Sequence, residues 1–254
     1  MFRSALIIAC IFLTLGGCAP TKTGLKLLPL NTNIVNKIIK VIDTQDRLVK
    51  SFVSYGKIKI RNASSCFSAD VMVAATMMPF RIKIEVTHYW GRPVCHILVQ
   101  DDMVYILSFI EKKYYIQPVG MPEQSGLFPF PSGKASLWGI LKGYPVLKRY
   151  SHVEITGDNR IAFADMHGRY TEILKPCMDN YFPCEVLFPK EHIRVVRSDF
   201  DRRNGIIFAC STDVFYQREN ISWRIILKQI LFNTDVPEGI FKLKVPSGYE
   251  TVQE

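Results

Sequence analysis

From about residue 50 onward, apolar and polar residues alternate in short runs, the pattern of β-strands with one buried face. In the clearest run one face carries Phe80, Ile82, Ile84, Val86, His88 and Trp90, and the other carries Arg81, Lys83, Glu85 and Thr87. Similar runs predict strands at residues 57–61, 66–75, 94–100, 103–109, 113–119, 151–157, 160–164, 169–174, 185–188, 191–199, 205–216 and 221–232. One apolar face and one solvated face predict an antiparallel sheet that curves over a core.

Two segments have helical spacing instead. Residues 31–53 place apolar side chains three or four positions apart, which predicts an amphipathic helix capped by Asn31 or Asn33. The stretch KASLWGILKGYP predicts a short helix with an apolar face of Leu137, Trp138 and Leu141. The Asn-Gly of RRNG, residues 202–205, predicts a tight hairpin. The chain is therefore predicted to be mainly β, in the α+β class.

The first 17 residues have the layout of a cleaved signal peptide. Arg3 is followed by an apolar run from Ala5 to Leu15 and by small residues at Gly16 and Gly17. The apolar run is shorter than the roughly 20 residues that a membrane-spanning helix needs. We expect residues 1–17 to be removed, residues 18–30 to form a tether, and residues 31–254 to form a single domain.

The C-terminal end of this segment together with the next residue, Leu15-Gly16-Gly17-Cys18, resembles the lipobox of bacterial lipoproteins. The resemblance implies a covalent lipid on Cys18, several acyl chains of which give stable anchoring. Ala19 departs from the Asp that favours retention at the inner membrane in this class, which implies the periplasmic face of the outer membrane. An ordinary signal peptide with an incidental cysteine is the alternative.

The chain is basic, with a formal net charge of +9, and its hydrophobic content of 48% is enough for a substantial core. Such a charge favours anionic lipid headgroups, acidic partners or nucleic acid. Export of the chain argues against nucleic acid.

Cysteine usage predicts one disulfide. Removal of Cys10 with the signal peptide and lipidation of Cys18 leave five cysteines. Cys177 and Cys184 are the closest pair and suit an oxidising compartment. The others, Cys66, Cys95 and Cys210, lie in strand-like runs, where buried small side chains are expected.

The sequence contains no pattern typical of catalysis. Cys95 and His96 are adjacent on a strand, so they point to opposite faces and cannot join His88 in a metal site. The acidic pairs Asp101 with Asp102 and Asp199 with Asp201 are expected at strand ends, in turns. No nucleophile elbow, phosphate-binding loop or dinucleotide fingerprint occurs. We expect no enzyme activity, no metal and no cofactor apart from the lipid on Cys18.

Three segments together resemble the LolA/LolB-like superfamily of periplasmic lipoprotein carriers and receptors, in particular LolB-type outer-membrane lipoproteins. They are RIKIEVTHYWGRPVCHILVQDDMVYIL, SLWGILKGYPV and the closing FKLKVPSGYE, in which Phe241, Pro246 and Gly248 match the pattern of the family's last strand. The resemblance implies an open half-barrel, a strongly curved antiparallel sheet with an N-terminal helix and a short lid helix over its concave face.

The resemblance also assigns residues. Trp90 before Gly91 matches a membrane-insertion loop, although an aromatic replaces the usual aliphatic residue; alternatively, Trp90 ends the core face that it shares with Val86. The lid helix corresponds to Leu137, Trp138, Ile140 and Leu141, with a short core helix as the alternative. The lipid cavity is expected to be lined by Phe80, Ile82, Ile84, Val86, Trp138, Leu141, Phe208 and Trp223.

Two functions remain open at this stage. The first is an anchored protein that binds lipid or the acyl chains of lipoproteins, received from a periplasmic carrier and inserted into the outer membrane. The second is a non-catalytic structural lipoprotein of an envelope assembly, with Leu127, Phe128 and Phe130 as a docking loop.

Overall fold

A computed structural model describes residues 29–120, 133–177 and 181–253 of the chain. The predicted signal peptide, almost all of the tether, Cys18, and the predicted docking loop of Leu127, Phe128 and Phe130 lie outside the described residues. No helix in the described ranges is long and apolar enough to cross a bilayer.

The described strands form one large sheet in the order β14-β6-β5-β4-β3-β2-β1-β13-β12-β11-β10-β9-β8-β7. Their bounds are β1 Ser51–Arg61, β2 Cys66–Met77, β3 Phe80–Thr87, β4 Pro93–Gln100, β5 Met103–Ser108, β6 Lys113–Pro118, β7 His152–Thr156, β8 Arg160–Ala164, β9 Tyr170–Pro176, β10 Pro183–Phe188, β11 Ile193–Arg203, β12 Ile206–Tyr216, β13 Ile221–Phe232 and β14 Glu250–Gln253. Neighbouring strands are antiparallel except β14, which pairs in parallel with β6, so the sheet is mixed.

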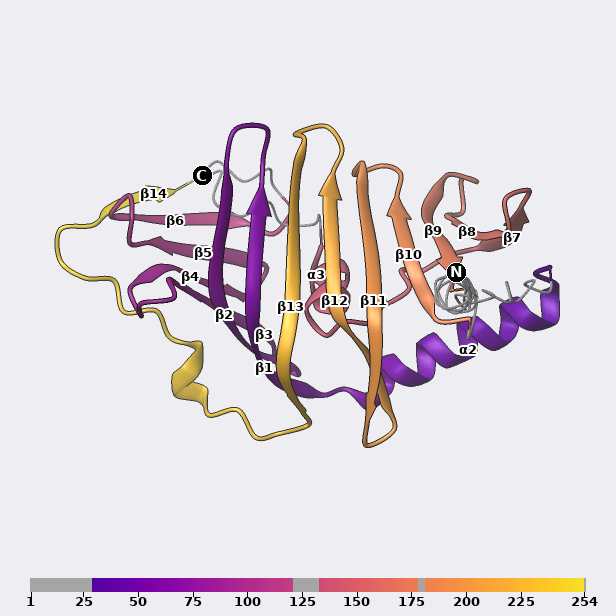
Figure 1. Cartoon of the computed structure of the whole chain (residues 1–254), viewed down its shortest axis with the longest axis horizontal. Coiled ribbons are helices and arrows are strands. Elements are labelled where there is room, and N and C mark those ends of the chain that lie inside the picture. Colours follow the sequence, from indigo (N-terminus) through magenta and orange to yellow (C-terminus); the bar gives the residue numbers. More distant parts are fainter. Residues whose placement is uncertain (1–28, 121–132, 178–180, 254) are drawn as a thin grey trace, which may run out of the picture.

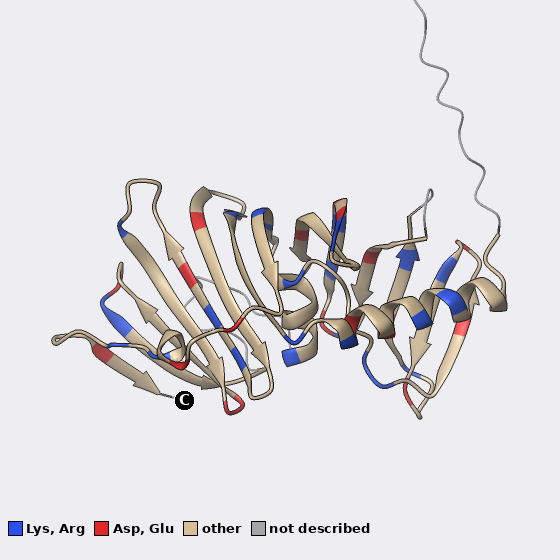
Figure 2. Ribbon diagram, turned by 90° about the horizontal axis from the view of Figure 1, so that it is seen from below, with Lys and Arg blue, Asp and Glu red and all other residues tan. Residues whose placement is uncertain are grey.

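The sheet bends into an arch that is open on one side. Figure 1 shows β1, β2 and β11 to β13 in front, with helix α3 (Lys134–Leu141) behind them. Figure 2, seen from below, shows α3 and helix α2 (Thr32–Leu48) beneath the arch, with α2 under the half that contains β7 to β12. Both helices therefore cover the concave face, in agreement with the predicted fold class.

Helix α2 begins where the sequence predicted and ends five residues earlier. The Asn31 side chain caps it by accepting a hydrogen bond from the backbone of Ile34 at 3.0 Å. The prediction that the helix continues to residue 53 was wrong, because Ser51 already begins β1. Tertiary bonds hold the chain extended here: the Lys50 N–H donates to Asn233 Oδ1 at 2.8 Å, and the Ser51 hydroxyl donates to the Thr234 carbonyl at 2.6 Å.

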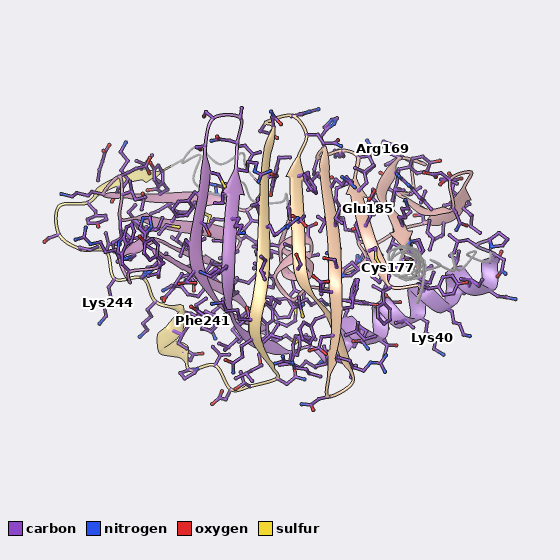
Figure 3. All side chains as sticks on the ribbon, viewed as in Figure 1. Lys40, Arg169, Cys177, Glu185, Phe241 and Lys244 are labelled. Carbon is purple, nitrogen blue, oxygen red and sulfur yellow. A yellow bond between two sulfur atoms is a disulfide. The ribbon has the colours of Figure 1, made fainter. Side chains whose placement is uncertain are left out.

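The C-terminal segment corrects two further expectations. Residues 242–249 contain no strand, and the last strand is β14; Pro246 has no N–H for a strand ladder and Gly248 has a φ of +84°. The segment instead runs over the convex face of β2 to β4, where Phe241 packs with Ala74 and Leu98 (Figure 3).

The C-terminal segment buries part of the face of β3 that was predicted to be solvated. The Lys83 side chain is only 4% exposed and donates to the Lys242 carbonyl at 2.9 Å. The Arg81 guanidinium lies 4.7 Å from the centre of the Phe241 ring and pairs with Glu238 at 2.9 Å. The polar face of a strand can thus be buried by a segment distant in sequence.

Turn residues account for most hairpins. Asn204 and Gly205 both have positive φ, +49° and +79°, which confirms the predicted tight turn between β11 and β12. Asp101 and Asp102, at +50° and +61°, form the turn between β4 and β5. Asp199 and Asp201 were expected at a strand end, but both lie inside β11. Asp199 has a φ of +55°, and the register is unchanged from the Ser198–Ser211 pair to the Phe200–Ala209 pair.

Candidate functional site

The residues expected to line a lipid cavity lie together in the main apolar core. Phe80, Ile82, Ile84 and Val86 come from β3, Trp138 and Leu141 from α3, Phe208 from β12 and Trp223 from β13. Phe80 is half-buried and the other seven are at most 2% exposed. The Trp138 ring packs on Phe52 and Phe80, with ring centres 5.0 and 6.2 Å apart. These side chains fill the space between α3 and the sheet by contact with each other.

Helix α3 is buried on all sides. The proposed lid residues Leu137, Trp138, Ile140 and Leu141 are 0 to 3% exposed. At its C-terminal end, Gly143 has a φ of +77°, and a Cβ atom there would lie 2.7 Å from the Ala209 carbonyl oxygen in β12. The Ala209 N–H donates to the Gly143 carbonyl at 2.8 Å. Close contact with β12 thus fixes this end of α3, and a gating movement stays a prediction from the resemblance.

An ion pair between a buried lysine and a half-buried aspartate joins the C-terminal end of α3 to α2. Lys142, 1% exposed, lies 2.5 Å from the Asp46 carboxylate of α2. Burial lowers the pKa of the Lys142 ammonium, and the negative charge of Asp46 opposes that shift.

An apolar groove of about 290 Å³ lies between α2 and the far end of the β11–β12 hairpin. It is lined by Ile34, Lys37, Ile38, Val41, Tyr144, Tyr181, Phe182, Arg202 and Ile207. Gln45 fixes the helix to the hairpin by donating to the Gly205 carbonyl at 3.1 Å and by accepting from the Ile207 N–H at 2.7 Å. This groove was not predicted from the sequence; the spacing of Ile34, Ile38 and Val41 on one face of α2 was the only available signal.

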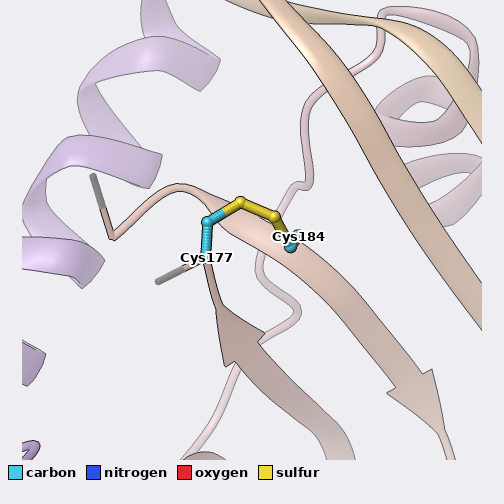
Figure 4. The surroundings of a disulfide bond; sticks show 2 residues. All are labelled: Cys177 and Cys184. Atoms are coloured by element: carbon cyan, nitrogen blue, oxygen red, sulfur yellow. A yellow bond between two sulfur atoms is a disulfide. The ribbon is translucent and has the colours of Figure 1, made fainter. Parts of the chain in front are cut away.

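A disulfide supports one wall of the groove. It joins Cys177 and Cys184, the pair expected from the sequence, whose Cα atoms are 5.2 Å apart (Figure 4). Within the loop that it closes, the Cys177 N–H donates to the Phe182 carbonyl, and the Phe182 ring lies 5.1 Å from that of Phe200. The disulfide therefore restricts the position of Phe182 on the groove.

The other cysteines differ in exposure. Cys95 is buried and Cys210 is half-buried, as expected for small apolar side chains. The expectation was wrong for Cys66, which is exposed because β2 begins there, next to the turn at residues 62–65.

Trp90 lies in the turn between β3 and β4. Its side chain is 55% exposed and that of Tyr89 is 75% exposed. The turn is closed by hydrogen bonds from the Gly91 N–H to the His88 carbonyl and from the His88 N–H to the Arg92 carbonyl, both 2.8 Å. The Trp90 ring stacks on His88 with ring centres 4.8 Å apart. The alternative that Trp90 ends the core face is wrong, since the strand ends at Thr87.

Buried charges lie between α3 and β9 to β11. Glu172 is 2% exposed and accepts a hydrogen bond from the Lys148 N–H at 3.3 Å, and Arg197, 3% exposed, donates to the Gly139 carbonyl of α3 at 3.4 Å. Burial raises the pKa of Glu172 to about 7, although the nearby charge of Lys148 opposes this. Burial also lowers the pKa of Arg197 to about 10. In both groups the loss of hydration outweighs their mutual attraction.

A polar cavity of about 540 Å³ lies beside these charges. It is lined by Lys148, Asp165, Arg169, Tyr170, Thr171, Pro189, Lys190 and Glu191. Its charged side chains largely pair among themselves, Lys148 with Glu191 at 2.9 Å and Arg169 with Asp165 at 3.0 Å. Among the described residues, no three His, Cys, Asp or Glu side chains lie close enough to hold a metal ion.

Comparison with known proteins finds similarity at the level of structure. No protein-family model matches the sequence, and no curated protein sequence matches it. A LolA superfamily protein from Nitrosomonas europaea superposes with a TM-score of 0.53 at 11% identity, covering 81% of this chain and 97% of the other.

Two further solved structures are similar. A domain from Vibrio parahaemolyticus, described as an outer membrane lipoprotein-sorting protein, gives a TM-score of 0.51 at 10% identity over 81% of this chain and 94% of its own. A DUF1329 family protein from Desulfovibrio piger gives a TM-score of 0.51 at 13% identity, covering 82% of this chain and 97% of the other. At these identities the likeness concerns the fold alone, and the chain has a LolA-like fold.

Proposed function

We propose that this protein is a lipid-anchored protein of the bacterial envelope that binds lipid, or the acyl chains of lipoproteins, without covalent catalysis. The observation that carries the proposal is the LolA-like arch, whose concave face is apolar and covered by two helices. Acyl chains bind such surfaces through buried area, at about 25 cal/mol per Å², without directional chemistry. The anchor would be the lipid on Cys18, at the periplasmic face of the outer membrane.

The exposed aromatic pair of Tyr89 and Trp90 supports contact with a membrane. Indole and phenol rings favour the interface between hydrocarbon and headgroups, because each has an apolar body and a polar edge. The pair lies in a turn and away from the core, so it can enter a bilayer without unfolding the sheet. We propose this turn as the place where bound lipid is passed to the membrane.

The proposal is tested by purifying the full chain from membranes in mild detergent and recording native mass spectra. The expected result is a population of the protein that carries a noncovalent lipid in addition to the covalent anchor. Absence of such a population, together with no uptake of lipid from vesicles by the purified protein, would contradict the proposal.

Fluorescence can test the membrane turn, since Trp138 and Trp223 are buried and Trp90 is the exposed tryptophan of the three in the chain. In the mature chain with Cys18→Ser, anionic vesicles should shift the emission of Trp90 to shorter wavelength. Trp90→Ser should lower vesicle affinity by roughly tenfold, because a buried aromatic side chain contributes about 1.5–3 kcal/mol.

Met166→Ser is the matched control, because Met166 is 81% exposed in the turn between β8 and β9. Equal losses of vesicle affinity from Trp90→Ser and Met166→Ser would show that any exposed apolar residue contributes to membrane binding. Such a result would contradict a special role of the Trp90 turn.

A further inference from the structure

The groove between α2 and the β11–β12 hairpin has two cations, Lys37 and Arg202, that form no ion pair with the residues that the structure describes. Lys37 on α2 and Arg202 at the end of β11 line its rim. Within the described part of the chain, neither side chain forms an ion pair. By contrast, the neighbouring Arg203 pairs with Asp201 and donates to the Ile230 carbonyl. The rim of an apolar groove is thus positively charged, with donors available for a ligand.

The floor of the groove adds the hydroxyl of a tyrosine. Tyr144 is 2% exposed and lines the groove, and its hydroxyl makes no hydrogen bond with the residues that the structure describes. The Tyr144 phenol stays neutral near pH 7, since burial raises its pKa, while the charges of Arg197 and Arg202 only partly oppose that shift. It is therefore a neutral hydrogen-bond donor on a residue that lines the groove.

The walls are apolar and fixed at both sides. Ile34, Ile38 and Val41 supply one wall from α2, and Tyr181 and Phe182 supply the other from the disulfide-closed loop. A volume of about 290 Å³ is at the lower end of the range for small-molecule sites, which suits one acyl chain better than two.

We propose that this groove binds a single-chain anionic amphiphile, with the chain between α2 and Phe182 and the anionic headgroup at Lys37, Arg202 and the Tyr144 hydroxyl. The proposal rests on the proposed lipid-binding function and adds its location and charge preference. A carboxylate and a phosphate monoester or diester share the required chemistry, because both accept from cationic donors.

Charge preference is tested by calorimetry of the purified full chain with four probes, two anionic and two without net charge. Palmitate and palmitoyl-lysophosphatidylglycerol should bind, and hexadecanol and palmitoyl-lysophosphatidylcholine should bind more weakly. The double variant Lys37→Gln with Arg202→Gln should weaken binding of the anionic probes roughly tenfold and leave hexadecanol unchanged. The effect on palmitoyl-lysophosphatidylcholine should be smaller than on the anionic probes, because its choline cation offsets the charge of its phosphodiester. The affinities for palmitate and for palmitoyl-lysophosphatidylglycerol, compared with each other, show whether the site prefers a carboxylate or a phosphate headgroup.

Lys40→Gln is the control for this double variant, because Lys40 is exposed on α2 and does not line the groove (Figure 3). Tyr144→Phe should cause a smaller loss, again for the anionic probes. Loss of binding with Lys40→Gln equal to that of the double variant would overturn the proposed headgroup site, since it would reflect the general positive charge of α2.

Location is tested by filling the groove. Val41 and Leu48 lie on the same helix and are 39% and 42% exposed, but only Val41 lines the groove. Val41→Trp should reduce palmitate binding at least tenfold, while Leu48→Trp should not change it, and thermal unfolding should confirm that both variants are folded.

The outcomes separate the two proposals. If lipid is still found in native mass spectra and palmitate still binds to Val41→Trp with unchanged affinity, the groove is not the site and the proposed function stands. If the unsubstituted protein binds none of the probes and carries no lipid, both proposals are wrong.

Discussion

The two helices beneath the arch differ in how completely they fill the space against the sheet. Helix α3 is buried on every side, with Trp138 fully enclosed and Gly143 in contact with the backbone of β12. Helix α2 buries one face only and leaves an open groove along Ile34, Ile38 and Val41. The difference indicates that α3 completes the core, whereas α2 leaves a cavity in which a ligand could be held.

The same contrast holds for charge. Beneath α3 the charged groups are buried and their pKa values are shifted by burial, as for Glu172 and Arg197. Beside α2 the cations Lys37 and Arg202 are exposed at the rim of the groove. The first arrangement affects stability and its pH dependence, and the second is suited to attracting an anion.

The largest expected effect is on packing under α3. Trp138→Ala should lower the free energy of unfolding by about 3–5 kcal/mol, because it leaves a cavity in a closed core. Val41→Ala, on the groove, should cost less than about 1 kcal/mol. Denaturant unfolding measures the free energy of unfolding of both variants. Similar losses of this free energy would show that the groove is as closely packed as the core.

Glu172 gives the next largest effect, through pH. Its folded pKa of about 7 exceeds the ordinary 4.5, so the folded state holds a proton that the unfolded state releases between these values. Its contribution to stability therefore falls as pH rises from 4.5 to 7 and then stays low.

Glu172→Gln should remove that slope and be more stable than the unsubstituted protein at alkaline pH, by about 2–3 kcal/mol. Near pH 4.5 the two proteins should have similar stability. Unfolding curves across this pH range provide the measurement, and parallel profiles of the two proteins would show that Glu172 is already charged in the folded state.

A smaller loss is expected from the disulfide beside α2. Cys177→Ala with Cys184→Ala should lower stability by about 2 kcal/mol, because the closed loop spans only seven positions. Palmitate affinity should fall as well, since Phe182 loses its restraint. Unchanged affinity in the folded double variant would mean that this wall of the groove keeps its position without the disulfide, with contacts such as that of Phe182 with Phe200 sufficient to hold it.

Local pattern was enough to predict most of the sheet. Strands Arg160–Ala164 and Ile221–Phe232 have the predicted bounds, because alternation and turn residues act over a few positions. The end of α2 and the path of residues 242–249 were predicted wrongly, because tertiary bonds at Ser51 and Lys83 decide them. Such contacts join segments more than 150 residues apart in sequence and leave no local signature.

The candidate site was predictable only in part. The exposed position of Trp90 follows from its place before Gly91 in a turn. The apolar residues of β3 were identified correctly as a shared face, but composition could not distinguish a packed core from a cavity, since both need the same side chains. The groove requires α2, the disulfide loop and Arg202 to meet, which depends on the whole topology.

The position of β1 in the middle of the sheet has a consequence for folding. Residues 52–61 pair with residues 222–232, so the arch is completed only when segments about 170 positions apart meet. Closing so long a loop is slow compared with forming hairpins between consecutive strands. Until β13 pairs with it, one edge of β1 has no partner strand, and such an edge promotes aggregation. The partly folded chain that precedes this pairing is therefore the state of this topology with the greatest tendency to aggregate.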